Sequence, residues 1–401
     1  MTHNSEFSAQ KQIPYGRQHI TQDDIDAVVE TLQSDFLTQG PKVAAFEQAF
    51  ASYVGAKYAV AVSNGTAALH LGALALGVDE TSRVITTPIT FVASANCVRY
   101  CGGAVDFADI DLANALLDID KVRQLLESKP KGYYTGIIPV DFAGNPVNLE
   151  EFRKLADAHD LWIMEDAAHA PGGYFYDSQG NKQLCGNGVF ADLAIFSFHP
   201  VKHIATSEGG MITTNNEKLY QKLLKLRTHG ITREPELLEE NDGGWYMAMQ
   251  ELGYNYRIPD MLCALGLSQM QRADAGLARR KGIAKVYDKA FAEVQGIDVL
   301  QTNSAVLGEH GDTGHAYHLY IIKVQDRKGL YDFLRQHNIL AQVHYIPAHT
   351  MPYYRNLGYS KGDFPEAEAY YSECLSLPMY PSLTQEEQAF VIEKVKEFVN
   401  R

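Results

Sequence analysis

The sequence predicts an α/β fold, in which a large domain with a mostly parallel seven-stranded sheet precedes a smaller C-terminal α+β domain. Up to about residue 215, short apolar runs alternate with amphipathic helical stretches. Such alternation is typical of a parallel sheet with helices on both faces. After residues 255–257 the pattern changes to a long helical region followed by two further strands. We therefore expect one domain over residues 1–260 and a second over residues 261–401.

The strands of the large domain are predicted from compact apolar runs bounded by turn residues. Seven such runs occur, at residues 58–62, 84–87, 104–110, 137–142, 161–164, 193–198 and 211–214.

Helix signals lie between these strands. Thr21 is the expected N-cap of a first helix whose apolar stripe comprises Ile25, Val28, Val29 and Leu32. A helix over residues 67–76 should end at Gly77, and Asn148 with Glu151 resembles a capping box.

The C-terminal part reads differently. A helical region extends from about residue 258 to 294, and strands are predicted over residues 318–324 and 341–345. The acidic, glycine-ended stretch at 235–244 is predicted to be a surface loop.

Composition excludes several functional classes. The chain has 401 residues, with 35 basic and 49 acidic side chains and a net charge of −14. This balance argues against non-specific binding to nucleic acid or to an anionic membrane. No run approaches the roughly 20 apolar residues of a membrane span, and the polar residues 1–12 lack the apolar core of a secretion signal. We expect a cytoplasmic protein.

The cysteines do not indicate a metal site or a disulfide framework. There are five, an odd number, and no pair has the spacing of a zinc finger. We expect all of them to be reduced and no metal to be bound; they are Cys97, Cys101, Cys185, Cys263 and Cys374.

Polar side chains follow four of the predicted strands. They lie at residues 63–66, 88–91, 165–169 and 199–202. Ligands bind outside the carboxyl ends of the strands in an open parallel sheet. These segments therefore indicate one site at this edge of the sheet.

Each of these segments has a functional reading and an ordinary structural one. The turn at Gly65 and Thr66 opens a helix, and its free N–H groups could bind phosphate or simply be capped. Asp166 could hold a charge on a ligand or cap a helix, and Phe91 could stack on a ring or pack in the core. Lys202 alone would be a surface lysine. Together they suit pyridoxal 5′-phosphate (PLP), which needs an amine, a carboxylate, an aromatic cover and a phosphate site.

Several motifs occur in a recognisable order. They read SNGTAAL at 63–69, TPITF at 87–91, EDAAHA at 165–170, SFHPVK at 197–202, EGG at 208–210 and GYNYR at 253–257. From about residue 13 to its end, the chain resembles the DegT-like family of PLP-dependent sugar aminotransferases. That resemblance implies the fold type I architecture of aspartate aminotransferase.

The resemblance also implies the roles of three catalytic residues. Lys202 would bind the cofactor covalently and shuttle the proton between substrate and cofactor. Asp166 would pair with the pyridine nitrogen, and His169 would lie near the 3′-oxygen of the ring.

Further residues are implied to bind the cofactor. Phe91 would stack on its ring, and three residues would hold its phosphate, namely Gly65, Thr66 and Ser197. Asn255 would reach the phosphate bound by the other subunit, so the resemblance implies a homodimer with shared active sites.

Two segments, FLTQG at 36–40 and AQVHYIP at 341–347, are similar to the subgroup of UDP-4-amino-4,6-dideoxy-N-acetyl-β-L-altrosamine transaminases of pseudaminic acid synthesis. This implies transfer of an amino group from L-glutamate to C4 of a UDP-linked 4-keto-6-deoxy-N-acetylhexosamine. The residues implied to bind that substrate are Tyr15, Phe36, Leu37, Thr38, Gln342, Val343, His344 and Tyr345, together with Gly65, Ser197 and Asn255.

Three alternatives remain. The chain could act on another dTDP- or UDP-linked sugar. It could be a PLP-dependent sugar dehydratase, in which a histidine replaces the lysine; position 202 is Lys, although His203 follows it. It could also be a non-catalytic regulatory or scaffold protein, which would not need Lys202, Asp166 and His169 together.

Overall fold

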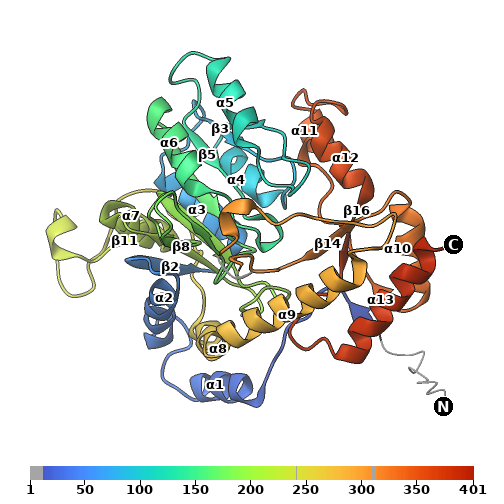
Figure 1. The fold of residues 1–401 in the computed structure, drawn as a ribbon. Coiled ribbons are helices and arrows are strands. Elements are labelled where there is room, and N and C mark those ends of the chain that lie inside the picture. Colours follow the sequence, from blue (N-terminus) through green and yellow to red (C-terminus); the bar gives the residue numbers. More distant parts are fainter. Residues whose placement is uncertain (1–11, 241, 309–312) are drawn as a thin grey trace.

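The computed structural model describes residues 12–240, 242–308 and 313–401. Residues 1–11, on which most of the argument against a secretion signal rests, and residue 241 of the acidic loop lie outside the described residues. The central element is a seven-stranded sheet in the order β2-β10-β9-β6-β5-β3-β4 (Figure 1).

The predicted strands of this sheet are confirmed, with shorter bounds in places. All pair in parallel except β10, which runs antiparallel to β2 and β9. The run predicted at 104–110 pairs over only four residues, and the run at 137–142 over only three. In the second run the predicted strand extends into a 3₁₀ turn, η1 (Phe142–Gly144). The strands are β2 (Tyr58–Val62), β3 (Arg83–Thr86), β4 (Ala104–Phe107), β5 (Gly136–Ile138), β6 (Trp162–Asp166), β9 (Leu193–Ser197) and β10 (Gly210–Thr214).

Helices cover both faces of the sheet, as predicted. Alternate strand residues such as Val84 and Ile85 point to opposite faces and enter different core clusters. One face packs against α3 (Gly65–Ala75), α4 (Ala93–Tyr100) and α7 (Glu217–Arg227). The other packs against α2 (Pro41–Val54), α5 (Ile119–Glu127), α6 (Leu149–His159) and α8 (Asp260–Met270).

Helix α1 (Gln22–Leu32) begins after Thr21, as predicted, but its apolar stripe does not enter the core. Ile25, Val29 and Leu32 are 48%, 43% and 51% exposed. The buried face instead carries Asp24, whose carboxylate accepts hydrogen bonds from Ser268 and the guanidinium of Arg272.

The capping box predicted at Asn148 does not form. Its backbone has φ −79° and ψ 84°, and the Leu149 N–H donates to the Val147 carbonyl. This is an inverse γ-turn, which directs the Asn148 amide away from the first turn of α6. The amide oxygen of Asn148 has no partner among the described residues.

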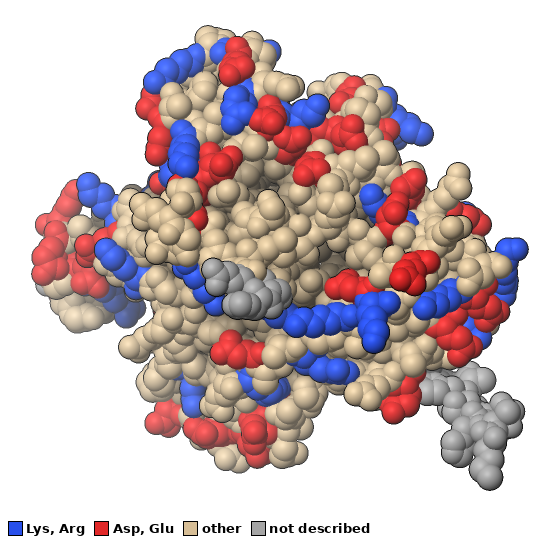
Figure 2. Space-filling model, in the orientation of Figure 1, with Lys and Arg blue, Asp and Glu red and all other residues tan. Residues whose placement is uncertain are grey.

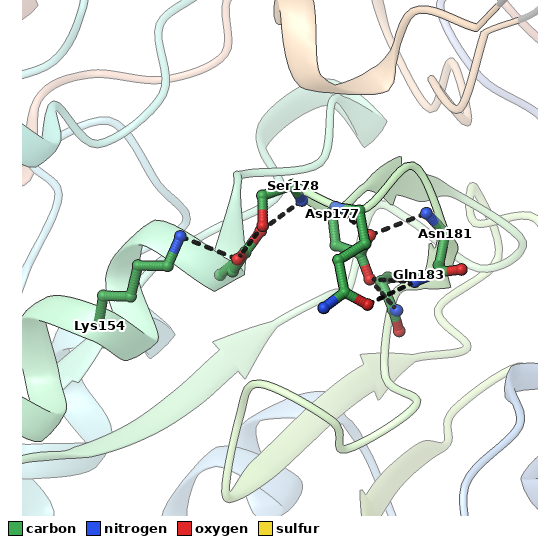
Figure 3. Close-up of polar contacts among 7 residues, drawn as sticks. Lys154, Asp177, Ser178, Asn181 and Gln183 are labelled. Atoms are coloured by element: carbon green, nitrogen blue, oxygen red, sulfur yellow. Dashed lines mark hydrogen bonds and ion pairs between the residues drawn. The ribbon is translucent and has the colours of Figure 1, made fainter.

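Helix α6 is instead joined to a neighbouring hairpin through Glu150. Glu150 pairs with Lys154 and accepts hydrogen bonds from the N–H and hydroxyl of Ser178 (Figure 3). Ser178 lies in the turn between β7 (Tyr174–Tyr176) and β8 (Lys182–Leu184), where Asp177 accepts bonds from Asn181 and Gln183. The contacts fix this turn to the large domain.

The predicted long helical region is two helices, α8 and α9 (Ala273–Phe291). Beyond them, a three-stranded sheet forms from β13 (Asp298–Val299), β14 (Tyr320–Lys323) and β16 (Cys374–Leu377). The strand predicted at 318–324 corresponds to β14. The other elements here are η3 (Ser304–Val306), α10 (Arg327–Gln336), η5 (Ala348–Thr350), α11 (Pro352–Arg355), α12 (Pro365–Glu373) and α13 (Gln385–Val399).

The strand predicted at residues 341–345 is wrong. Regular pairing ends with β15 (Ile339–Leu340), which pairs in parallel with β1 (Ile13–Pro14), and beyond it only Gln342 bridges to Ser376. The chain then turns away to form a wall of the cavity described below. The pairing of β1 with β15 also spans the division proposed at residues 260/261, which stays a prediction.

The acidic stretch lies at the surface, as predicted. It belongs to a hairpin that projects from the molecule (Figure 1), with strands β11 (Ile231–Thr232) and β12 (Ala248–Met249) and the 3₁₀ turn η2 (Pro235–Leu237). All five cysteines are free. Among the described residues, no helix has both the length and the apolar character needed to cross a bilayer.

Candidate active site

A cavity of about 680 Å³ opens at the carboxyl edge of the sheet. The segments that follow β2, β3, β6 and β9 all line it, so the four polar segments noted in the sequence meet in one place. The sequence-predicted residues in its wall are Tyr15, Gly65, Thr66, Phe91, Asp166, His169, Ser197, Lys202, His344 and Tyr345.

The other sequence-predicted residues lie outside this cavity in the single chain. Phe36, Leu37 and Thr38 are exposed between α1 and α2. Asn255 is exposed and bridges to Thr228. Gln342 and Val343 precede the two lining residues, His344 and Tyr345. Their binding roles remain predictions.

The N-terminus of α3 forms one end of the cavity. The Asn64 side chain accepts the Ala67 N–H at 2.8 Å, which leaves the N–H groups of Gly65 and Thr66 without intrahelical acceptors. A Cβ on Gly65 would lie 2.9 Å from Cβ of Ser197. Only glycine therefore permits β9 and the helix end to approach so closely, and together they form an anion site beside the Ser197 hydroxyl.

Asp166 ends β6 inside the cavity. Its side chain is buried, Oδ2 accepts a hydrogen bond of 2.6 Å from Ser94 Oγ, and Oδ1 accepts the Ala168 N–H at 3.1 Å. Burial raises the pKa of Asp166, and the bonds from Ser94 and Ala168 and the charge of Lys202 oppose that rise. The carboxylate lines the cavity, and no described residue forms an ion pair with it.

Lys202 lies in the loop after β9. Its Nζ is 3.4 Å from Nε2 of His318. Burial lowers the pKa of Lys202 to about 7, while Asp166 acts in the opposite direction. A substantial fraction of the amine is therefore uncharged near neutral pH, which is the nucleophilic form.

His169 is neutral, because burial and the charge of Lys202 hold its pKa well below the usual value. Its Nδ1 accepts the Ala143 N–H at 3.2 Å, so the proton resides on Nε2, 3.3 Å from the Tyr345 hydroxyl. The ring also packs against His318, with centroids 4.2 Å apart. His169 thereby connects the large domain to the C-terminal part of the chain.

Sequence reasoning missed His318 and Ser94. The prediction treated His318 only as the first residue of a strand. The pair His315 and His318, which precedes the observed strand β14, is the signal that could have identified His318 as a site residue. Ser94 is the second residue of α4, four residues after Thr90, and the two hydroxyls are 2.7 Å apart. That spacing after a strand end is the signal that could have identified it.

A buried acidic group lies behind Asp166. Ligand atoms of Asp141, Glu165 and Cys185 all lie within 4.8 Å of one another. Burial raises the pKa of Asp141 to about 7 and that of Glu165 well above its usual value, the latter further raised by Asp141. Glu165 thus keeps its proton and donates it to Asp141.

The family model for the DegT/DnrJ/EryC1/StrS aminotransferase family matches residues 18–396. The chain belongs to this family. The match covers Lys202, Asp166 and the other described residues of the cavity wall except Tyr15, and it extends into α13. The protein is accordingly a PLP-dependent sugar aminotransferase with a fold type I architecture.

Individual relatives match over nearly their whole length. Spore coat polysaccharide biosynthesis protein SpsC of Bacillus subtilis is 37% identical over 395 residues, 96% of this chain and 97% of its own. The UDP-4-amino-4,6-dideoxy-N-acetyl-β-L-altrosamine transaminase of Campylobacter jejuni subsp. jejuni serotype O:2 is 35% identical over 395 residues, 96% and 98% of the two chains.

Solved structures of aminotransferases support the family assignment. Helicobacter pylori PseC, an aminotransferase involved in the biosynthesis of pseudoaminic acid, superposes with a TM-score of 0.85 at 30% identity, covering 97% of this chain and all of PseC. Streptococcus pneumoniae Spr1654 in its PLP form gives 0.85 at 29% identity, covering 97% and 99%.

The residues in the cavity fit the cofactor. The end of α3 and Ser197 offer free donors for a phosphate, and buried Asp166, oriented by Ser94 and Ala168, offers a carboxylate for a protonated ring nitrogen. Lys202 supplies the amine. The Phe91 ring is exposed at the rim, 6.2 Å from the Tyr345 ring, so its stacking role remains a prediction.

Proposed function

We propose that this aminotransferase moves an amino group from L-glutamate to the C4 keto carbon of a UDP-linked 4-keto-6-deoxy-N-acetylhexosamine. The observation that carries this proposal is the 35% identity to the Campylobacter jejuni transaminase over almost both chains. The likeness to PseC supports it, as does the position of His344 and Tyr345, from the AQVHYIP segment, in the cavity wall.

The chain's residues divide the work of the reaction. When bound, PLP accepts the amino group and delocalises the electron pair that remains when the substrate C–H bond breaks. Asp166 keeps the proton on the ring nitrogen, which requires its carboxylate to stay ionised; the hydrogen bond from Ser94 serves that purpose. The end of α3 fixes the phosphate.

Lys202 moves the proton. An amine with a pKa near 7 can both accept and release a proton at neutral pH. His318, at 3.4 Å, limits where Nζ can lie. His169 holds its Nε2 proton toward Tyr345 and is available to donate to an oxygen in the cavity.

The proposal includes a homodimer with shared sites. The stripe on α1 and the Phe36 and Leu37 side chains that follow it in the sequence are apolar and exposed, and a second subunit would cover them. Asn255 is exposed rather than turned into its own cavity, as a residue acting in the partner's site should be. Five free cysteines fit a reducing compartment, and we place the enzyme in the cytoplasm.

A second candidate is transfer to a different nucleotide sugar. The identity to SpsC, 37%, is slightly higher than that to the Campylobacter jejuni transaminase, and the name of SpsC refers to spore coat polysaccharide. The two candidates share Lys202, Asp166 and the donor reaction. They differ only in the acceptor sugar.

One spectroscopic experiment tests the amino donor and the acceptor sugar in separate steps. L-Glutamate added to the yellow holoenzyme should bleach the visible band of the lysine-bound cofactor. A UDP-linked 4-keto-6-deoxy-N-acetylhexosamine should then restore it faster than a dTDP-linked 4-keto sugar does. Faster recovery with the dTDP sugar would favour the second candidate. No bleaching by glutamate, with normal cofactor content, would contradict glutamate as donor; the Lys202→Ala variant provides the blank.

A further inference from the structure

Lys202 also lines a second, smaller cavity. Its volume is about 180 Å³, and it lies where the segment after β1 passes the junction of α8 and α9. We call it the cationic cleft. Its charged or titratable lining residues are Arg17, His19, Lys202, His203, Arg272 and Arg279. Among the described residues that line it, none is Asp or Glu.

The charges of this cleft are only partly neutralised. Arg272 is held by Asp24 in a two-pronged ion pair. Arg279 donates from one nitrogen to the Leu383 carbonyl, and within the described ranges neither Arg279 nor Arg17 has a carboxylate partner. Lys and Arg side chains also gather over α9 on the molecular surface (Figure 2). Two guanidinium groups are therefore available to a ligand.

The main cavity has the opposite balance. Lys202 is the single Lys or Arg among the described residues that line it, and the same wall carries the carboxylates of Asp166 and Glu208. The cofactor phosphate has the helix end of α3. A dicarboxylic amino donor finds no other fixed cation there, whereas a guanidinium binds a carboxylate through two parallel hydrogen bonds.

We propose that the cationic cleft binds a carboxylate of the amino donor through Arg279 and Arg17. Lys202 lines both the cleft and the main cavity, so a donor held by its carboxylate in the cleft would extend its amine toward the residue that carries out the chemistry. This inference rests on the proposed function, because it assumes a dicarboxylic donor such as L-glutamate.

The test uses glutarate, a dicarboxylate that has no amine and cannot react. Isothermal titration of glutarate into the PLP-loaded enzyme gives a dissociation constant for wild type, Arg279→Gln, Arg17→Gln and Arg279→Lys. We expect each Gln variant to weaken glutarate binding about tenfold or more, the usual loss for a charge-assisted hydrogen bond. Arg279→Lys should retain much of it.

Lys285→Gln is the matched control, because it removes one charge from an exposed position of the same helix α9. It should leave glutarate binding unchanged. UDP binding, measured in parallel, should be the same in all variants. Bleaching of wild type by L-glutamate tests the proposed function independently of the cleft.

Three results would overturn the inference. The first is that wild type binds no glutarate, and the second is that Arg279→Gln and Arg17→Gln bind it as well as wild type does. The third is that the variants lose UDP while keeping glutarate, which would assign the cleft to the phosphates of the nucleotide. A failure of glutamate bleaching in wild type, with glutarate binding still dependent on Arg279, would instead refute glutamate as donor and leave a carboxylate-binding cleft.

Discussion

The hydroxyl of Ser94 donates a hydrogen bond of 2.6 Å to Oδ2 of Asp166, across 72 positions of sequence. Asp166 is fully enclosed by the sheet edge, and burial alone would favour its neutral form. Ser94 is the largest influence in the other direction. A residue on α4 therefore helps to keep the carboxylate ionised at the position where the ring nitrogen of PLP must be held.

Ser94→Ala should lower turnover about tenfold or more, because a hydrogen bond to a charged group is lost. The pKa of Asp166 should rise, so the loss should be greatest at low pH. Turnover measured from pH 6 to 9 checks this. Ser52→Ala, which removes an exposed hydroxyl bonded to the Gln48 carbonyl, is the control; an identical loss at every pH would contradict the electrostatic explanation.

Asp166→Asn should leave the fold intact, abolish most turnover and lower the pKa of Lys202 in the apoenzyme below 7. The reason is that Asp166 supplies the negative charge that raises this pKa against burial. The measurement is the pH dependence of labelling by pyridoxal, located at Lys202 by mass spectrometry. An unchanged or raised midpoint would show that Asp166 does not act on the amine, and near-normal turnover would refute its assignment to the ring nitrogen.

Glu165→Gln should stabilise the protein increasingly as pH rises. Both Asp141 and Glu165 have raised pKa values in the fold, so the native state holds protons that the unfolded chain releases. Their stabilising contribution is present below the usual carboxyl range and is lost as pH rises. The amide of Gln can still donate to Asp141 without titrating.

Urea unfolding of the apoenzyme between pH 5 and pH 8 measures this effect. The difference between Glu165→Gln and wild type should grow in the variant's favour with pH, by at most about 1.4 kcal/mol per proton and pH unit. Glu127→Gln, at an exposed position, should show no such trend. A difference that stays constant with pH would mean that Glu165 is ionised in the native state.

Val29→Asp should dissociate the dimer. Val29 is 43% exposed at the centre of the α1 stripe, and a carboxylate there would be desolvated in an interface at a cost of several kcal/mol. Sedimentation velocity should show monomers for this variant and dimers for Leu357→Asp, which places the same change on an exposed leucine elsewhere. A dimeric Val29→Asp protein would exclude the stripe from the interface.

Mixing Lys202→Ala with Asn255→Ala should restore activity if Asn255 acts in the partner's site. In a mixed dimer, one site carries both lesions and the other carries neither. Co-expression followed by tandem-tag purification isolates the mixed species, whose turnover per dimer should approach half that of wild type. Turnover no higher than that of the Asn255→Ala dimer would place Asn255 in its own subunit's site.

The strands of the large domain could be predicted from the sequence because they are buried on both faces. Runs such as 58–62 and 193–196 are continuous in apolar residues, and tertiary burial and local pattern agree there. The site formed by the polar residues after those strands could also be predicted, because a parallel sheet brings the carboxyl ends of its strands to one edge.

The predictions that were wrong or incomplete concern residues whose positions depend on contacts that leave no pattern in the local sequence. The segment at 341–345 alternates like a strand, but it turns away after Leu340 to meet the cavity, and periodicity does not record that. His318 reaches Lys202 from 116 residues away. Asn148 has the residue type of a cap, while an inverse γ-turn sets its direction.

The helix α1 and its apolar stripe were predicted correctly, but the sequence did not show that the stripe lies outside the chain's own core. Amphipathic spacing indicates which face avoids water, but it does not distinguish the chain's own core from another subunit. In this helix the core receives Asp24 and Thr31, and the apolar residues remain outside.

The parallel pairing of β1 with β15 has a consequence for biosynthesis. Ile13 can pair with its partner, Ile339, only after the whole of the intervening chain, including the seven-stranded sheet, has been translated. Tyr15, beside it, and His318, His344 and Tyr345 complete the wall around Lys202. The nascent chain can therefore form its seven-stranded sheet before the wall of the active site is complete, so cofactor capture follows the formation of that sheet.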